Sequence, residues 1–175
     1  MTKPLGLGII TAALKQGKLP AAAVAEAMRI MVTLNKGAAE AMVTVGAHTC
    51  TDVTGFGLLG HLRELVNAGS VSAVLRFENV PVLEEAVHLL RQGLIPNGSR
   101  RNLDSLREWL YVADGVGEEA LLLLADAQTS GGLLIALPAD AAERLKAELL
   151  SNGVPDFADI GEIVAGSGGR IHIEP

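Results

Sequence analysis

The sequence predicts an α+β fold in which a mixed β-sheet is covered by helices. Segments with apolar residues at helical spacing alternate irregularly with short segments of strand character. The 175-residue chain is 49% hydrophobic and only 3% aromatic, so its core must be aliphatic. No glycine- or serine-rich linker divides it, and a chain of this length buries enough apolar surface to fold without disulfides or a structural metal. We therefore expect one domain over residues 1–175.

A long helix is predicted over residues 21–45. Its apolar residues recur at steps of three and four, and its opposite face is polar. Pro20 suits the first turn of a helix, and Gly46 suits its end. The β-tolerant segment that follows predicts a short strand. The apolar positions of the helix are Val24, Ala27, Met28, Met31, Leu34, Ala38 and Met42.

The middle of the chain predicts a helix, a strand and a second helix. Residues 56–68 place four leucines and Val66 on one side of a helix that ends near Gly69. His61, one turn into this helix, fits a capping or packing role better than a contact to phosphate. Residues 70–77 alternate as in a strand, and Pro81 then opens a helix that runs to residue 91.

Residues 99–102 follow a Pro-Asn-Gly sequence and are predicted to form a compact polar loop. Arg100 and Arg101 could bind phosphate oxygens there, although a solvated turn is the favoured interpretation. Residues 133–138 are an apolar run of strand length. The small residues 129–132 before it could admit a ligand close to the backbone or form a tight turn.

The end of the chain predicts one more helix and two strands. Residues 138–150 have the spacing of an amphipathic helix. Residues 160–164 and 171–173 predict closing strands around a Gly-Ser-Gly-Gly turn.

The most informative segment is CTDVTGFGLLGHL at residues 50–62, which places polar residues and glycines directly before a helix. Asp52 offers a hard oxygen ligand, and Thr51 and Thr54 offer hydroxyl groups. Gly55 and Gly57 would let the backbone approach a bound anion or metal. The same residues also suit a helix cap with turn glycines. The segment matches neither a Walker loop nor a dinucleotide-binding turn.

Charge and cysteine content exclude several classes of protein. The formal net charge is −6 without long runs of like charge, which argues against a nucleic-acid surface. No apolar run reaches the roughly 18 residues of a membrane helix, and the start resembles neither a signal nor a transit peptide, so we expect a cytoplasmic protein. The single Cys50 cannot form an intramolecular disulfide and fits a buried structural thiol better than a nucleophile. The four histidines lack zinc-ligand spacing.

Five segments together resemble selenophosphate synthetase. They are TKPLGLGII from Thr2, TDVTGFGLLGHLREL from Thr51, VPVLEEAVHLL from Val80, GLIPNGSRRNL from Gly93 and DAQTSGGLLIALP from Asp126. The resemblance runs in order over nearly the whole chain. It implies the carboxy-terminal domain of that family, which is shared with the aminoimidazole ribonucleotide synthetase superfamily. The amino-terminal half, with the reactive Cys or selenocysteine, its Lys partner and most aspartates around ATP, has no match.

The resemblance also implies a function. The family converts selenide, ATP and water to selenophosphate, AMP and phosphate with Mg²⁺, and Asp52 occupies the place of one magnesium ligand. No catalytic residue and no other cofactor-binding residue carries over, so the chain alone should be inactive. Its expected partners are ATP, selenide and the amino-terminal domain, in a homodimeric parent. The alternatives are another ATP-dependent superfamily member, acting in purine synthesis, on thiamine phosphate or in hydrogenase maturation, or a noncatalytic binding or assembly domain.

Overall fold

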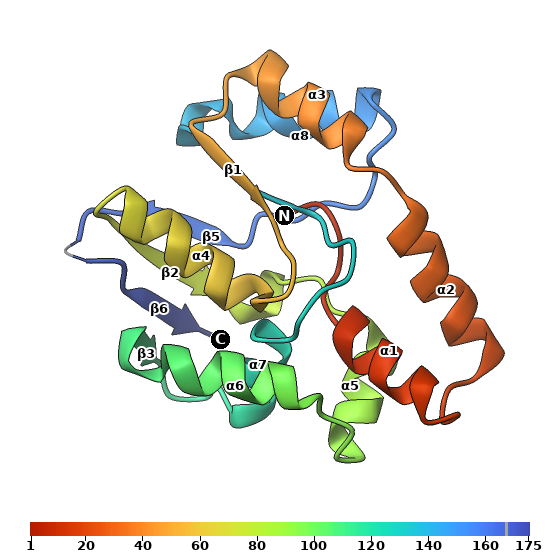
Figure 1. Cartoon of the computed structure of the whole chain (residues 1–175). Coiled ribbons are helices and arrows are strands. Elements are labelled where there is room, and N and C mark those ends of the chain that lie inside the picture. Colours follow the sequence, from red (N-terminus) through yellow and green to blue (C-terminus); the bar gives the residue numbers. More distant parts are fainter. Residues whose placement is uncertain (167) are drawn as a thin grey trace.

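The computed structural model describes residues 1–166 and 168–175, and it confirms the predicted α+β class (Figure 1). The helices are α1 (Leu7–Lys15), α2 (Ala21–Val32), α3 (Lys36–Val45), α4 (Gly57–Ala68), α5 (Glu84–Arg91), α6 (Asn97–Leu106), α7 (Glu118–Leu124) and α8 (Ala142–Ser151). Short 3₁₀ turns lie at Phe77–Asn79, Arg107–Trp109 and Ala139–Ala141. The strands are β1 (Thr49–Asp52), β2 (Ser72–Arg76), β3 (Leu110–Val112), β4 (Leu133–Ala136), β5 (Gly161–Val164) and β6 (Ile171–Glu174).

The described strands form two sheets. β1 and β4 make an antiparallel pair in which Asp52 lies opposite Leu133. The other sheet has the order β3-β6-β2-β5, with β2 and β3 parallel to β6 and β5 antiparallel to β2. Both parallel and antiparallel pairs are present, so the prediction of a mixed arrangement is confirmed.

The prediction of one helix over residues 21–45 is wrong, because the chain breaks between α2 and α3. Thr33 has an extended backbone, with φ −65° and ψ 120°. Its carbonyl oxygen accepts a hydrogen bond from Lys3 Nζ at 2.6 Å, and the Met31 carbonyl accepts one from Ser130 Oγ at 2.7 Å. The Asn35 amide donates to the Gly131 carbonyl at 2.9 Å. Partners distant in sequence thus bind the carbonyl groups at which α2 ends, and periodicity cannot reveal them.

Residues 99–102 lie in helix α6, so the predicted polar loop is also wrong. Pro96 has an extended backbone just before the helix, and the Pro-Asn-Gly sequence forms its start instead of a turn. Ser99, Leu103 and Leu106 are spaced by four and three residues and are buried on one face. Arg100 and Arg101 are exposed.

The predicted closing strands exist, but they do not form a hairpin. β5 and β6 lie on opposite edges of β2 and do not pair with each other. Ser167 of the predicted Gly-Ser-Gly-Gly turn lies outside the described residues. The other predicted helices and strands are confirmed with shifted ends; α5, for example, begins at Glu84 and not at Pro81.

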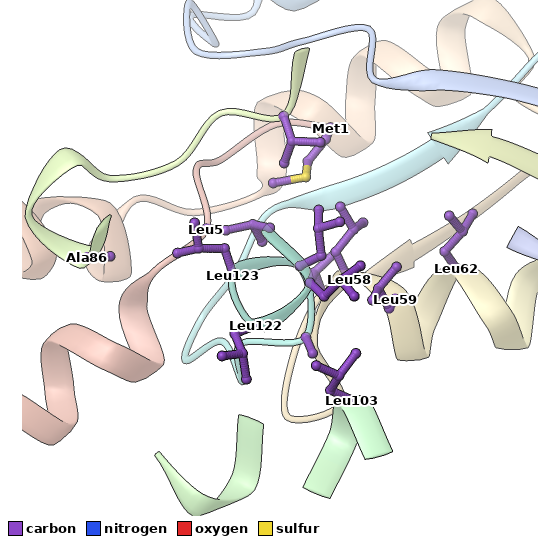
Figure 2. Close-up of a cluster of buried hydrophobic side chains, with 14 of the residues drawn as sticks. Met1, Leu5, Leu58, Leu59, Leu62, Ala86, Leu103, Leu122 and Leu123 are labelled. Carbon is purple, nitrogen blue, oxygen red and sulfur yellow. The ribbon is translucent and has the colours of Figure 1, made fainter. Parts of the chain in front are cut away.

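The core is aliphatic, as the composition predicts. Its larger cluster joins the start of the chain to the long apolar helices, with Leu5, Leu58 and Leu59 fully buried (Figure 2). A smaller cluster packs α3 and α8 beside the β1–β4 pair. Truncating a buried leucine to alanine costs about 2–5 kcal/mol, so both clusters fix the positions of the loops between these elements.

Membrane insertion through a helix has no support among the described residues. None of their helices combines the length and the apolar character that crossing a bilayer requires.

Candidate functional site

Asp52 ends strand β1, and the chain on both sides of it is held by backbone pairing. Asp52 lies opposite Leu133 in the ladder, and the next N–H, of Val53, donates to the Gly132 carbonyl at 2.9 Å. The side chain of Asp52 is exposed. Among residues 1–166 and 168–175, none donates a side-chain hydrogen bond to its carboxylate, and Thr51 Oγ1 contacts only the Asp52 carbonyl, at 3.3 Å. Asp52 therefore presents a free carboxylate from a fixed backbone.

Thr54 has a structural role in the loop that follows Asp52. Its carbonyl accepts hydrogen bonds from the N–H groups of Gln128, at 2.9 Å, and Gly57, at 3.0 Å. Its hydroxyl lies 3.0 Å from Nε2 of the buried His61. The contact with His61 uses the Thr54 hydroxyl that the sequence suggested for a ligand. His61 is thereby confirmed as a packing residue of α4.

Two glycines let the segments after β1 and before β4 approach each other closely. Gly57 has φ +71°, and a Cβ there would lie 2.6 Å from the Ala125 carbonyl carbon. A Cβ on Gly131 would overlap the Val53 carbonyl oxygen. Of the two interpretations of residues 129–132, the structure thus supplies a packing reason for the small residues.

A third segment joins this contact through Asn102 of helix α6. Its side-chain amide donates to the Gly55 carbonyl at 2.9 Å and to the Ala125 carbonyl at 3.1 Å. The loops around Asp52 and Asp126 and the middle of α6 therefore meet at one place. The sequence singled out all three segments but could not show that they touch.

Asp126 is a buried carboxylate that sequence reasoning missed. It accepts hydrogen bonds from the N–H of Gly8, at 2.9 Å, and of Ile9, at 3.3 Å, in the first turn of α1. Ser99 Oγ donates to it at 2.8 Å, and Gln128 Nε2 donates at 3.0 Å. Burial raises the pKa of Asp126 from 3.8 to about 6, although these four donors act to lower it. Asp126 caps a helix from a distant segment and is shielded from ligands.

Lys3 is the second residue that sequence reasoning missed. Its ammonium group donates to the Thr33 carbonyl at 2.6 Å and to the Ser130 carbonyl at 2.9 Å, and the residue is buried. Lys3 thereby ties the end of α2 to the segment before β4. A lone lysine near the start of a chain gives no signal of such a role.

Cys50 is half-buried and packs against the smaller core cluster. Burial, and then the negative charge of Asp52, raise the pKa of its thiol, which keeps it protonated. These surroundings support the structural interpretation of Cys50.

Asp52 is the residue that the sequence singled out as a metal ligand. Within the described ranges, no group of three or more His, Cys, Asp or Glu side chains could hold a metal ion. An exposed carboxylate on a fixed backbone fits the part of one oxygen ligand to a hard cation such as Mg²⁺.

Comparison with known sequences identifies a family model and named relatives that match nearly the whole chain. The family profile for AIR synthase related protein, C-terminal domain, matches residues 1–174. Selenide, water dikinase of Carboxydothermus hydrogenoformans is 41% identical over 174 residues, which are 99% of this chain and 50% of that protein. The enzyme of Porphyromonas gingivalis is 46% identical over 160 residues, covering 91% of this chain and 45% of its own length. The chain thus spans about half the length of the curated relatives it matches.

Solved structures share the fold at lower sequence identity. Hydrogenase maturation protein HypE superposes with a TM-score of 0.65 at 21% identity, over 97% of this chain and 46% of that one. Thiamine-monophosphate kinase from Stenotrophomonas maltophilia gives a TM-score of 0.54 at 19% identity, over 98% and 48%. At these identities the likeness concerns the fold alone.

Proposed function

Because the chain belongs to the family of AIR synthase related proteins, as their C-terminal domain, we propose that residues 1–175 are the carboxy-terminal domain of a selenide, water dikinase. The proposal is supported by curated relatives of that name that are 35–46% identical over 91–99% of this chain. The parent protein would convert selenide, ATP and water to selenophosphate, AMP and phosphate, in the cytoplasm and as a homodimer.

Within that reaction the domain would supply Asp52 as one ligand of Mg²⁺ at the ATP phosphates. The observation that carries this role is the exposed Asp52 carboxylate at the fixed end of β1, which the described residues leave without a side-chain donor. Magnesium shares its shell with phosphate oxygens and water, so one carboxylate per domain suffices. When bound, the ion would neutralise charge on the phosphate oxygens.

The preceding domain would bind most of ATP and carry the reactive Cys or selenocysteine. The solved structure of HypE in complex with ATP has the same fold over 98% of this chain, with a TM-score of 0.65 and 20% identity, which is consistent with a nucleotide nearby. This domain would then form one wall of the ATP site, supply one ligand of the metal ion and support the site from outside. The chain by itself should release no AMP.

The test is Asp52→Asn in the full-length parent protein, with selenide-dependent AMP release as the readout. Asn keeps the shape of Asp52 but removes the charge that a hard cation needs. We expect turnover to fall by roughly 100-fold, the upper end of the loss that is typical of residues that only orient a metal ligand. The matched control is Asp114→Asn, which removes another exposed carboxylate, after strand β3, and should leave turnover unchanged.

The alternatives are separated by the same measurement. Unchanged turnover in Asp52→Asn would support a noncatalytic binding or assembly domain. AMP or ADP release that is indifferent to selenide would support another ATP-dependent superfamily member. The named relatives favour the dikinase over another superfamily member, because the thiamine-phosphate and hydrogenase-maturation proteins share only the fold, at 14–21% identity.

A further inference from the structure

Two neighbouring arginines of helix α6, Arg100 and Arg101, carry charges that nothing else in the described part of the chain neutralises. Both side chains are exposed, and neither forms an ion pair or a side-chain hydrogen bond with any described residue. Arg107, directly after α6, is by contrast paired with both Asp104 and Glu118. The two guanidinium groups of α6 are therefore available to an anionic ligand.

The two arginines point to different sides of α6. Successive residues of an α-helix are rotated by about 100°, which places Asn102 about 100° from Arg101 and about 160° from Arg100. Asn102 marks the side of the helix that faces the loop after Asp52, because its amide donates to the Gly55 carbonyl at 2.9 Å. Arg101 therefore lies nearer to this loop around the helix axis, and Arg100 lies on the far side.

There is room for the Arg101 side chain between its own position and the loop. Side chains in a helix lean toward its N-terminus, over the residues three and four positions earlier, and the residue three positions before Arg101 is Gly98. Around the helix axis Gly98 lies between Arg101 and Asn102, and nothing is within 4 Å of where its Cβ would be. The same holds for Gly55 on the loop. The contact between α6 and the loop thus has open space at both of these glycines.

The backbone around this space is held in place. The Asn102 amide also donates to the Ala125 carbonyl at 3.1 Å, and the Thr54 carbonyl accepts from the Gln128 N–H at 2.9 Å. Helix α6 packs along α4, which begins where the loop ends (Figure 1). Asp52 at the end of β1 and helix α6 are therefore fixed relative to each other, and an arginine side chain on α6 keeps its freedom to reach a ligand.

The ligand proposed for Asp52 needs more positive charge than one metal ion supplies. A single Mg²⁺ neutralises only part of the charge on a triphosphate, and the Asp52 carboxylate uses some of the charge of the ion. A guanidinium group can bind two phosphate oxygens at once and stays protonated in proteins. Arginine and Mg²⁺ commonly act together on phosphate groups that are being transferred. Arg101 has the chemistry and the position for this part.

We propose that Arg101 binds a phosphate group of the nucleotide whose Mg²⁺ is held by Asp52, and that Arg100 does not. The inference rests on the proposed function, because it assigns one more residue to the same nucleotide site. It adds a cation that comes from a different segment of the chain than Asp52. The two side chains would then hold the phosphates from two directions.

The test measures the Kd of ATP for the full-length parent protein by calorimetry, in the presence of Mg²⁺ and without selenide. Arg101→Gln should weaken ATP binding by roughly tenfold, the usual loss for a hydrogen bond to a charged group, and Arg101→Glu should weaken it further. The matched controls are Arg100→Gln and Arg100→Glu, which remove the same charge one residue away and should stay within about twofold of the wild type. Equal losses in the two series would overturn the proposal.

A second ligand separates a contact with phosphate from a general disturbance of the site. Adenosine has no phosphate group, so its affinity should be the same for the wild type and Arg101→Gln. An equal loss of adenosine and ATP binding in this variant would also overturn the proposal. Circular dichroism checks that the variants are folded, which the exposure of both arginines leads us to expect.

Failure of this inference can be told apart from failure of the proposed function. If the wild-type parent binds ATP but releases AMP or ADP without regard to selenide, the dikinase assignment is wrong, and the comparison of Arg101 with Arg100 still decides the inference. If AMP release depends on selenide and Arg101→Gln binds ATP as tightly as the wild type, the inference alone is wrong.

Discussion

The N–H of Gly8 donates a hydrogen bond to Oδ2 of Asp126 at 2.9 Å, across a sequence separation of 118 residues. Through this contact, a carboxylate from the segment before β4 caps the first turn of α1. Helix starts leave backbone N–H groups without partners inside the helix, and an anion there is favoured by the helix dipole. Asp126 therefore joins the beginning of the chain to the segment that packs against the loop after Asp52.

Asp126→Asn should lower the free energy of unfolding by about 1–3 kcal/mol at pH 7, the usual worth of a charge-assisted buried hydrogen bond. The Asn amide group would also bring N–H donors toward those of Gly8 and Ile9. Urea denaturation of the whole chain measures the change. Asp114→Asn, which alters an exposed carboxylate, should stay within about 0.5 kcal/mol of the wild type. Equal stability of both variants would show that the charge of Asp126 does not contribute to the free energy of unfolding.

The same residue predicts a pH dependence. Burial raises the pKa of folded Asp126 from 3.8 to about 6, so between these values the folded chain binds more protons than the unfolded chain. The pH-dependent part of the contribution of Asp126 to the free energy of unfolding is thus largest below pH 4 and is lost as the pH rises through about 6. The stability advantage of the wild type over Asp126→Asn should grow by about 2–3 kcal/mol from pH 7 to pH 4. Comparing the two proteins cancels other titrating groups, including the Met1 amine. A constant difference across this range would contradict the shifted pKa.

Gly131→Ala should destabilise the chain by on the order of 3 kcal/mol, because the new methyl group would overlap the Val53 carbonyl oxygen and backbone cannot move aside cheaply. Thermal denaturation by calorimetry detects the loss. The matched control is Gly98→Ala in α6, where nothing lies within 4 Å of the added Cβ and the backbone is helical. That change should be stabilising by about 0.5–1 kcal/mol. If both variants behave alike, the close approach of residues 131 and 53 is not maintained in solution.

Lys3→Met should leave the carbonyl groups of Thr33 and Ser130 without their donor and cost about 2 kcal/mol. The break between α2 and α3 should also become more accessible to protease, because Lys3 holds it against the segment before β4. Limited proteolysis at low protease concentration, with the cleavage site identified by mass spectrometry, measures this effect. Lys18→Met, at an exposed lysine, should change neither stability nor the cleavage pattern. Unchanged cleavage in Lys3→Met would mean that the break is held by other contacts.

The parts of the fold that the sequence predicts are those governed by local periodicity. The helix predicted over residues 56–68 begins one residue later, at Gly57, and ends at Ala68 as predicted. It could be predicted because its leucines repeat clearly on one face. The break at Thr33 was not predicted because the partners that hold it are far away in the sequence: Lys3 donates to the Thr33 carbonyl, and the Gly131 carbonyl accepts from Asn35. Helix α6 was not predicted because its Pro-Asn-Gly start has the composition of a turn. The spacing of Ser99, Leu103 and Leu106 is nevertheless that of a helix.

The candidate site also contains one residue that the local sequence indicates and one that depends on distant contacts. Asp52 stands out because the polar residues around it are contiguous, and its role as a magnesium ligand stays a prediction. Asp126 lies among small residues and has no periodic pattern, and three of its four donors come from α1 and α6. A buried carboxylate of this kind is recognised only when the donors around it are known.

The position of β2 between β5 and β6 constrains how the chain can fold during synthesis. β2 is made early, but both of its neighbours come from residues 161–174. Until those residues leave the ribosome, the backbone edges of Ala73 and Leu75 have no native partner. Such non-local pairing slows folding and exposes strand edges to aggregation. The nascent chain should therefore depend on chaperones that shield β2 until translation has passed β6.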